Sequence, residues 1–275
     1  MKSNTQIDVV ISTLNEGVER VHNIFRGHRD DVRYLIVHQV DGALSSDSQL
    51  AVEKLMLRGD VNYFAMLGRG LSRSRNFGID KSKGDLCWLL DDDVVIDGEA
   101  FDLIIATFLG GPLVIAYTYM MATPDGRIFK KYAKTSRPHN LLSINKVSSV
   151  EVVLNRRLFQ KLGCKFDERL GLGAEIPLGE ENALMKSITA KKGRVVFYPN
   201  VIVRHPEETT GRDFNTSMAF NKGAQFSIVY GKVALLLCLL FSIKKWKMYR
   251  SKISFLTFSF YIYKGCFKYL TQEKV

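Results

Sequence analysis

Four short apolar runs alternate with longer mixed segments over the first ninety residues, and this alternation constrains the fold more than any other feature. Each run is too short for a helix and nearly continuously apolar, as a strand buried on both faces should be. The segments between the runs have helical spacing. The chain is therefore predicted to be an α/β protein with a mainly parallel, Rossmann-like sheet flanked by helices. The runs cover residues 7–12, 34–40, 61–66 and 86–90, and the helical segments residues 18–29, 49–57 and 71–82.

Further elements of the same kind are expected after residue 90. Pro124-Asp125-Gly126 is a typical turn sequence between two apolar runs, so we expect a hairpin there. Gly193 is expected to end a helix, and Pro199 to follow the last strand. The predicted helices cover residues 99–109 and 180–192, the strands residues 149–155 and 195–198, and the hairpin arms residues 114–121 and 127–132.

The composition changes near residue 213, which divides the chain into a predicted α/β domain (residues 1–213) and a helical C-terminal region (residues 214–275). Acidic residues are absent from Ser217 until Glu273, while Lys, Arg, Leu and aromatic residues dominate. The longest apolar run, residues 233–243, is 11 residues long, whereas a spanning helix needs about 20. This run and the basic, aromatic residues behind it predict docking on a membrane surface. The alternative is that they complete the core or a dimer interface.

Charge and cysteine content limit the partners and the compartment. Lys and Arg number 39 against 28 Asp and Glu, a net charge of +11 that predicts an anionic partner such as nucleic acid, lipid or a phosphorylated substrate. The four cysteines form no C-x-x-C pair, which indicates reduced thiols and a cytoplasmic location. The N-terminal residues lack a signal-peptide pattern, so secretion is not expected.

Three consecutive carboxylates, Asp91-Asp92-Asp93, follow the fourth apolar run. In an open α/β sheet, ligands bind at this end of the strands. Crowding three carboxylates is unfavourable unless a cation compensates, and Mg²⁺ or Mn²⁺ binds carboxylates together with substrate phosphates. The pattern thus predicts a metal ion that bridges to a diphosphate. The alternative is a solvated acidic turn at a helix start.

A glycine-rich basic segment, residues 68–76, begins as a loop and leads into the third helical segment. Gly70 would permit close approach of the backbone to a ligand, and Arg73 and Arg75 would complement negative charge at a helix N-terminus. This favours a diphosphate cradle. An ordinary solvated helix start is the alternative.

Five motifs in this order and spacing make residues 7–210 resemble the inverting family 2 glycosyltransferases of the GT-A fold. They are Ser12-Thr13-Leu14-Asn15-Glu16 after the first strand, Asp41 after the second, Arg75-Asn76-x-Gly78 within residues 70–78, Asp91-Asp92-Asp93, and Gly179-Glu180-Glu181 before a helix. The family's processive synthases add several spanning helices and a Gln-x-x-Arg-Trp element, which this sequence lacks. The resemblance therefore implies addition of a single sugar.

The resemblance also implies roles for the matching residues. A carboxylate of Glu181 or Glu180 would take the acceptor's proton; the family has Asp where Glu181 stands, which leaves open which of the two is the base. Mn²⁺ or Mg²⁺ would be held chiefly by Asp93, with Asp91 and His205 as further ligands. Residues 166–174 resemble the acceptor-side loop. The implied donor-binding residues are Thr13, Leu14, Asn15, Glu16, Asp41, Gly70, Arg73, Arg75, Asn76, Asp91 and Asp92.

The predicted partners are a nucleotide diphosphate sugar, with uridine favoured by family habit, and a saccharide or lipid-linked acceptor of bacterial cell-surface polysaccharide synthesis. The enzyme would be peripheral on the inner face of the cell membrane and would not bind nucleic acid. Two other classes remain open from the sequence. One is a nucleotidyltransferase, which also uses aspartates on a metal, and the other is a non-catalytic module that binds anionic ligands.

Overall fold

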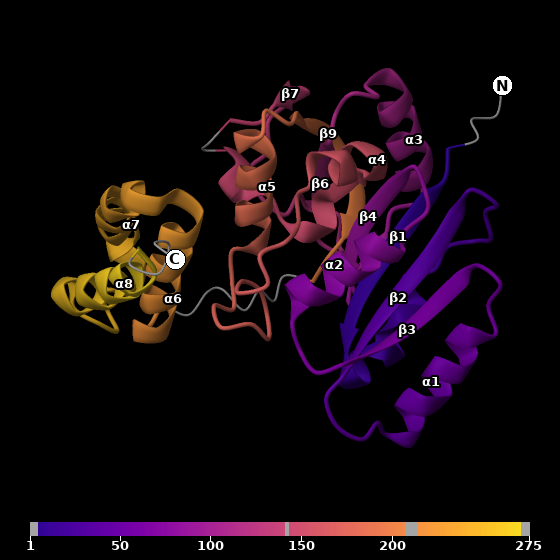
Figure 1. The fold of residues 1–275 in the computed structure, drawn as a ribbon, viewed down its shortest axis with the longest axis horizontal. Coiled ribbons are helices and arrows are strands. Elements are labelled where there is room, and N and C mark those ends of the chain that lie inside the picture. The colour runs from indigo at the N-terminus through magenta and orange to yellow at the C-terminus, as the bar shows by residue number, and fades with distance from the viewer. Residues whose placement is uncertain (1–4, 141–142, 207–213, 271–275) are drawn as a thin grey trace.

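A computed structural model describes residues 5–140, 143–206 and 214–270 of the chain. A mixed sheet has helices on both faces, and a group of C-terminal helices lies beside it (Figure 1). The strands are β1 (Ile7–Leu14), β2 (Val32–Val40), β3 (Val61–Leu67), β4 (Leu86–Asp91), β5 (Val95–Ile96), β6 (Ala116–Ala122), β7 (Arg137–Pro138), β8 (Val152–Asn155) and β9 (Val195–Arg204). The α-helices are α1 (Ser46–Met56), α2 (Leu71–Lys81), α3 (Ala100–Gly110), α4 (Arg156–Leu162), α5 (Glu180–Ala190), α6 (Thr216–Tyr230), α7 (Ala234–Tyr249) and α8 (Phe255–Leu270).

The strand order is β3-β2-β1-β4-β8-β6-β9-β5, with β7 paired to β9. Strands β1 to β4 run parallel, and the predicted α/β fold is confirmed. Strand β8 runs antiparallel to both of its neighbours. The chain adds β2 and β3 on one side of β1 and then crosses to add β4 on the other side. The order thus reverses between β1 and β4, where open α/β sheets bind their ligands.

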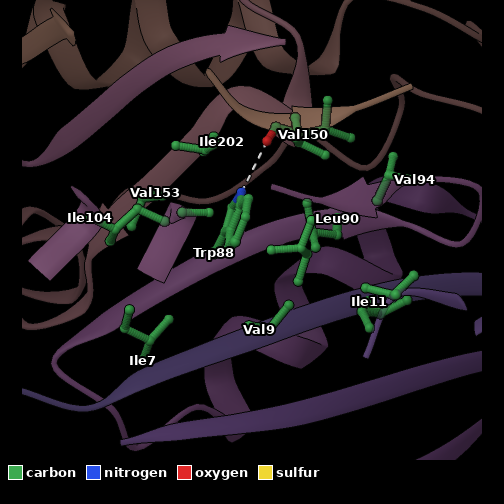
Figure 2. Packing of buried hydrophobic residues seen from close by; sticks show 14 of the residues in the cluster. Ile7, Val9, Ile11, Trp88, Leu90, Val94, Ile104, Val150, Val153 and Ile202 are labelled. Carbon is green, nitrogen blue, oxygen red and sulfur yellow. Dashed lines mark hydrogen bonds between the residues drawn. The ribbon is translucent and has the colours of Figure 1, made fainter. Parts of the chain in front are cut away.

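Alternating side chains of the central strands fill two cores, one on each face of the sheet. Ile11 and Trp88 face η1, a 3₁₀ helix over Asn15–Asn23, and α3, whereas Val10 and Leu89 face α2 and α5. Figure 2 shows Trp88 at the centre of the first core, where its indole N–H donates a 2.9 Å hydrogen bond to the Val150 carbonyl. Burial on both faces explains why the strand sequences are almost continuously apolar.

The first helical prediction, residues 18–29, was wrong in type and extent. The segment is the 3₁₀ helix η1, and the chain leaves it at Ile24. Val18, Val21 and Ile24 recur every three residues and are all buried. This spacing aligns side chains on a helix with three residues per turn, but not on an α-helix.

The predicted hairpin is reduced to a single antiparallel bridge between Ala122 and Ile128. The turn forms as expected, with Gly126 at φ +87°, but the second arm leaves the sheet. Its side chains Lys130 and Tyr132 turn inward and hydrogen-bond to the buried Glu151 carboxylate. Strand β6 is instead flanked by β8 and β9.

The last strand was predicted too short, because β9 continues through Pro199 to Arg204. The register between β6 and β9 shifts beside this proline. Such an irregularity accommodates a residue that lacks an N–H for the ladder. The extension brings the end of β9 to the same end of the sheet as the carboxyl end of β4.

Helices α6, α7 and α8 pack around a core of their own, which includes Phe226, Cys238, Phe258 and Ile262. A Cβ atom on Gly223 would lie 1.8 Å from the Ile262 carbonyl oxygen, so the backbones of α6 and α8 are in direct contact. All four cysteines are free and buried, as predicted for reduced thiols. The predicted domain boundary at residue 213 lies outside the described residues.

The described residues include one helical stretch, residues 216–249, that is long and apolar enough by composition to cross a membrane. The sequence prediction considered only residues 233–243 and judged them too short. In the structure α6, η5 (Gly231–Val233) and α7 follow one another without a gap. Only 28% of the most apolar window in this stretch is buried. A single stretch of this kind is weak evidence for a membrane span.

Candidate active site

The predicted site residues converge where β1 and β4 end side by side. Ser12 of β1 is paired with Asp91 of β4, so the end of β1 and the start of η1 lie against the three aspartates. Gly17 is in η1, and a Cβ atom there would lie 2.2 Å from Asp92 Oδ2. Only glycine permits this close approach.

Asp92 has protein partners on both carboxylate oxygens. The Arg20 guanidinium donates to Oδ1 at 2.6 Å, and the Thr13 hydroxyl donates to Oδ2 at 2.6 Å. The hydrogen bond to Asp92 raises the pKa of Arg20. Sequence reasoning missed Arg20, because it lies in a segment taken for an ordinary helix. Asp92 thus joins the end of β1, through Thr13, to η1, through Arg20.

Arg75 is 1% exposed and lies among three carboxylates. It donates to Asp91 at 2.8 Å, to Glu180 at 3.3 Å and to Glu181 at 3.5 Å. The sequence predicted that this guanidinium would face a diphosphate. The structure instead shows it tying the end of β4 to the start of α5. The carboxylate cluster is therefore compensated by arginines at Asp91 and Asp92, a solution that the sequence analysis did not consider.

Glu180 and Glu181 occupy the first turn of α5 but differ in access. The side chain of Glu180 is 7% exposed and that of Glu181 is 18% exposed. Burial, followed by the charge of Glu181, raises the pKa of Glu180 to about 7, although Arg75 opposes the rise. Glu180 also lies under the loop around Gly171, where an added Cβ would lie 3.2 Å from its carboxyl carbon. Glu181 is the more accessible acid.

Asp93 is the most exposed of the three aspartates, at 41%, and faces His205. Nδ1 of His205 lies 2.6 Å from the Pro206 carbonyl oxygen, so this nitrogen carries the ring proton. Nε2 lies 3.4 Å from Asp93 Oδ1; it faces the carboxylate with a lone pair in the neutral ring and with a proton in the imidazolium. Burial raises the pKa of Asp93, a positive charge on His205 lowers it, and the charges of Asp91 and Asp92 raise it further.

Two electron-rich atoms that face each other fit a divalent cation. No group of three His, Cys, Asp or Glu side chains arranged to hold a metal occurs among the described residues. Phosphate oxygens and water would therefore have to complete the coordination of Mn²⁺ or Mg²⁺, which is usual for Mg²⁺ at phosphate sites.

The start of η1 and the end of β2 form an open part of the site. The Asn15 side chain accepts a 2.8 Å hydrogen bond from the Asp41 N–H, and Arg69 pairs with the Asp41 carboxylate. The buried His38 ring bonds the Asn15 carbonyl oxygen at 2.8 Å and holds the residue at φ +46°. Leu14 ends β1, and Glu16 lies in the first turn of η1. His38 was missed because it lies inside a strand.

The start of α2 contacts other parts of the protein through groups that were predicted to face phosphate. The Gly70 N–H donates to the Gln39 side chain at 2.7 Å. Asn76 is buried and hydrogen-bonds the backbone of Phe166 on both sides. Arg73 is exposed and donates to the Leu67 carbonyl oxygen at 3.2 Å. The α2 segment thus holds the loop of residues 166–174 over the site.

Helix α6 packs directly behind the two glutamates. The Gln225 amide donates to the Asn182 side chain at 2.7 Å, and a Cβ atom on Gly179 would lie 2.4 Å from the Gln225 side chain. Gly179 has φ +89° and immediately precedes Glu180. The C-terminal helices therefore support the turn from which α5 begins, a contact for which the sequence carried no signal.

Residues 8–162 match the profile of glycosyl transferase family 2. The chain belongs to this family. It is therefore a glycosyltransferase, rather than a nucleotidyltransferase or a non-catalytic module. No curated protein matches the sequence.

Solved structures of TarS from S. aureus resemble this glycosyltransferase in fold. TarS residues 1–349 superpose with a TM-score of 0.63 at 14% identity, covering 90% of this chain and 75% of that one. The same fragment has been solved with UDP and with UDP-GlcNAc; the latter gives a TM-score of 0.60 at 14% identity, covering 90% and 76%. For longer TarS the TM-score is 0.58 at 13% identity, with 87% of this chain and 43% of TarS covered. The fold is that of the GT-A glycosyltransferases.

Proposed function

We propose that the enzyme transfers one sugar from a UDP-sugar to a saccharide or lipid-linked acceptor, with inversion, in bacterial cell-surface polysaccharide synthesis. The observation that carries this proposal is the meeting of Glu181, Arg75 and Asp91 with the Asp93–His205 pair where the strand order reverses. The TarS structures with UDP and UDP-GlcNAc support the choice of donor. Residues 1–213 would form the catalytic domain.

The nucleotide would bind in the open part of the site. Asp41 and Asn15 are joined there, and the Asp41 carboxylate is 46% exposed. Arg69 is 55% exposed and can break its ion pair with Asp41. The Asp41 carboxylate would then bind ribose or base, and Arg69 would turn toward phosphate. Thr13, Leu14 and Glu16 would line this pocket, with Gly70 and Arg73 at its edge, whereas Arg75, Asn76 and Asp92 would act by fixing its walls.

Asp93 and His205 would hold Mn²⁺ or Mg²⁺ against the diphosphate. The ion would supply positive charge to the departing nucleotide. Asp91 would contribute less to metal binding, because one of its carboxylate oxygens already accepts a hydrogen bond from Arg75.

Glu181 would be the general base. A base must reach the acceptor hydroxyl, and Glu181 is the more exposed of the two acids. Its carboxylate would take the proton as the hydroxyl oxygen bonds to the anomeric carbon and the bond to the diphosphate breaks. Glu180, buried with its pKa raised to about 7, would instead position Arg75.

The C-terminal helices would dock the enzyme on the anionic inner face of the cell membrane. Large apolar side chains lie exposed on one side of α7, at Leu236, Leu239, Leu240 and Ile243, a helical spacing of three or four residues. Leu256 and Phe260 are likewise exposed on α8. Apolar surface of this kind usually marks an interaction site.

The charge of this region favours a lipid partner over a second protein. Residues 217–272 contain no acid, and exposed lysines lie on α7, at Lys244 and Lys247, and in the turn after it, at Lys252. Each cation near an anionic surface contributes about 1 kcal/mol. Membrane docking would bring the active site to a lipid-linked acceptor.

Product analysis with a panel of UDP-sugars and with UTP tests the proposed reaction. We expect UDP release from at least one UDP-sugar and no pyrophosphate from UTP, with Glu181→Gln lowering the UDP release. Release of pyrophosphate from UTP, or UDP release that Glu181→Gln leaves unchanged, would contradict the proposal.

A further inference from the structure

A cavity of about 280 Å³ opens beside β6 and β9, separate from the three aspartates. Its apolar side is formed by Tyr132 and Phe197, whose rings stack with centroids 5.9 Å apart. Its polar side is formed by Thr118 and His139, which share a 2.7 Å hydrogen bond. An apolar wall beside fixed hydroxyl and imidazole groups is the usual lining of a small-molecule site.

The rim of this cavity is cationic. Lys131, Arg137 and Lys146 all line it, and none of the three forms an ion pair within the described part of the chain. The only acid in the lining is Glu151, which is buried and already bonded to Lys130 at 2.9 Å. The cavity therefore presents an excess of positive charge without a carboxylate to offset it.

The polar groups of the cavity are held rigidly. His139 bonds Thr118 through Nε2 and the Ser143 hydroxyl at 3.0 Å through Nδ1. Burial, followed by the charge of Arg137, lowers the pKa of His139 to about 4, so the ring is neutral at pH 7. The low pKa thus follows mainly from burial, and the positive charge of Arg137 adds to it.

The cavity lies on the acceptor side of the proposed reaction. Thr118 is four residues before Ala122, whose carbonyl accepts from the His205 N–H at 2.9 Å, and four strand residues span about 13 Å. Asn182, next to Glu181, donates at 3.4 Å to the Ile144 carbonyl of the segment that lines the cavity. An extended saccharide that starts at Glu181 can thus reach the cavity, while the donor part of the site lies on the other side of β4.

We propose that this cavity binds an anionic group of the acceptor, a phosphate or carboxylate on a sugar unit distant from the reacting hydroxyl. The inference rests on the proposed glycosyl transfer and adds the acceptor's chemical class. Arg137 and Lys146 would bind the charge, and Tyr132 and Phe197 would contact the ring.

Ligand-observed NMR on the full chain, with and without UDP and Mn²⁺, tests this assignment. The probes are α-D-glucose 1-phosphate, D-glucuronate and neutral methyl α-D-glucoside. We expect at least one charged probe to bind in the presence of UDP, and binding to weaken about tenfold or more in Arg137→Gln/Lys146→Gln. The control Lys54→Gln/Lys161→Gln removes two exposed lysines on α1 and α4 and should change nothing.

Several outcomes would overturn the assignment: equal binding of the neutral probe, displacement of the charged probes by UDP, or unchanged binding in the double variant. The two charged probes separate phosphate from carboxylate recognition. UDP binding is measured in the same samples. If the probes bind but UDP does not, the proposed transfer reaction is contradicted and the cavity assignment is not. If UDP binds but no charged probe does, the cavity assignment is contradicted and the transfer reaction is not.

Discussion

The carboxyl end of β4 and the C-terminal helices are both rich in charged side chains, but the charges are paired at β4 and mostly of one sign on the helices. At β4, Asp91 and Asp92 are each bound to an arginine, and Asp93, the most exposed of the three, faces His205. The C-terminal helices carry many cations with few acids nearby, alongside exposed leucines. Paired charge fixes the geometry of a reaction site, whereas unpaired charge beside exposed apolar surface is available to a partner.

The largest expected effect is the loss of activity when Glu181, the more accessible acid of the cluster around Arg75, is replaced. Glu181→Gln should lower kcat by about 10²- to 10⁴-fold, because the general base is lost, while KM for the donor stays nearly unchanged. Glu180→Gln is the matched control and should lose much less. Steady-state kinetics measure both variants. An equal loss in both would remove the distinction between base and positioning residue.

Arg75→Gln should destabilise the fold by about 3–5 kcal/mol, since three carboxylates would be left without their buried partner. Denaturant unfolding at pH 7 measures the change. Arg69→Gln, at an exposed pair with Asp41, is the control and should cost below about 1 kcal/mol. If the two variants were equally stable, the cluster would not be held together by Arg75.

Stability should depend on pH through Glu180, whose pKa is raised to about 7. A carboxyl whose folded pKa lies above its unfolded value stabilises the fold while protonated, and this contribution is lost as pH rises from about 4.5 to 7. Glu180→Gln should therefore match the wild type near pH 4 and become more stable by up to about 3 kcal/mol above pH 7. Unfolding curves over this pH range that stay parallel would contradict the raised pKa.

On the C-terminal side of the comparison, Leu236→Glu/Leu240→Glu should release the enzyme from anionic vesicles. Burying each leucine in lipid is worth about 1.5–3 kcal/mol, so binding should weaken by at least tenfold. Vesicle sedimentation measures the effect, and Leu57→Glu, at a leucine of the sheet domain that is more exposed than either of these, should change nothing. Retention of the double variant on the vesicles after a high-salt wash would contradict docking through the exposed face of α7.

The smallest effect concerns the contact that joins the two regions. Gln225→Ala removes the hydrogen bond to Asn182 and should cost about 1 kcal/mol of stability. It should also reduce kcat modestly with the pH profile intact, because it loosens the turn before Glu180. Ser227→Ala, whose hydroxyl bonds α8 instead, is the control for activity. Equal kcat in both variants would show that the C-terminal helices act only as a membrane anchor.

The sequence predicted the βα order, because strands buried on both faces must be apolar throughout. It also predicted that Asp91, Asp92 and Asp93 would lie at the end of the sheet where open α/β folds bind their ligands, because they directly follow the fourth apolar run. It did not predict the 3₁₀ helix, whose three-residue repeat was taken for α-helical spacing. Arg20, His38 and Gln225 were missed because each acts through a partner far away in the chain, and no local pattern records that pairing.

The most direct test of the account is thermal stabilisation by UDP and by GDP, each with and without Mn²⁺, in the wild type and in Asp93→Ala. We expect UDP with Mn²⁺ to raise the Tm of the wild type, with little effect of UDP alone or of GDP, and the shift to be lost in the variant. Metal-dependent stabilisation that Asp93→Ala retains, or no stabilisation by UDP at all, would contradict a nucleotide site at the end of β4.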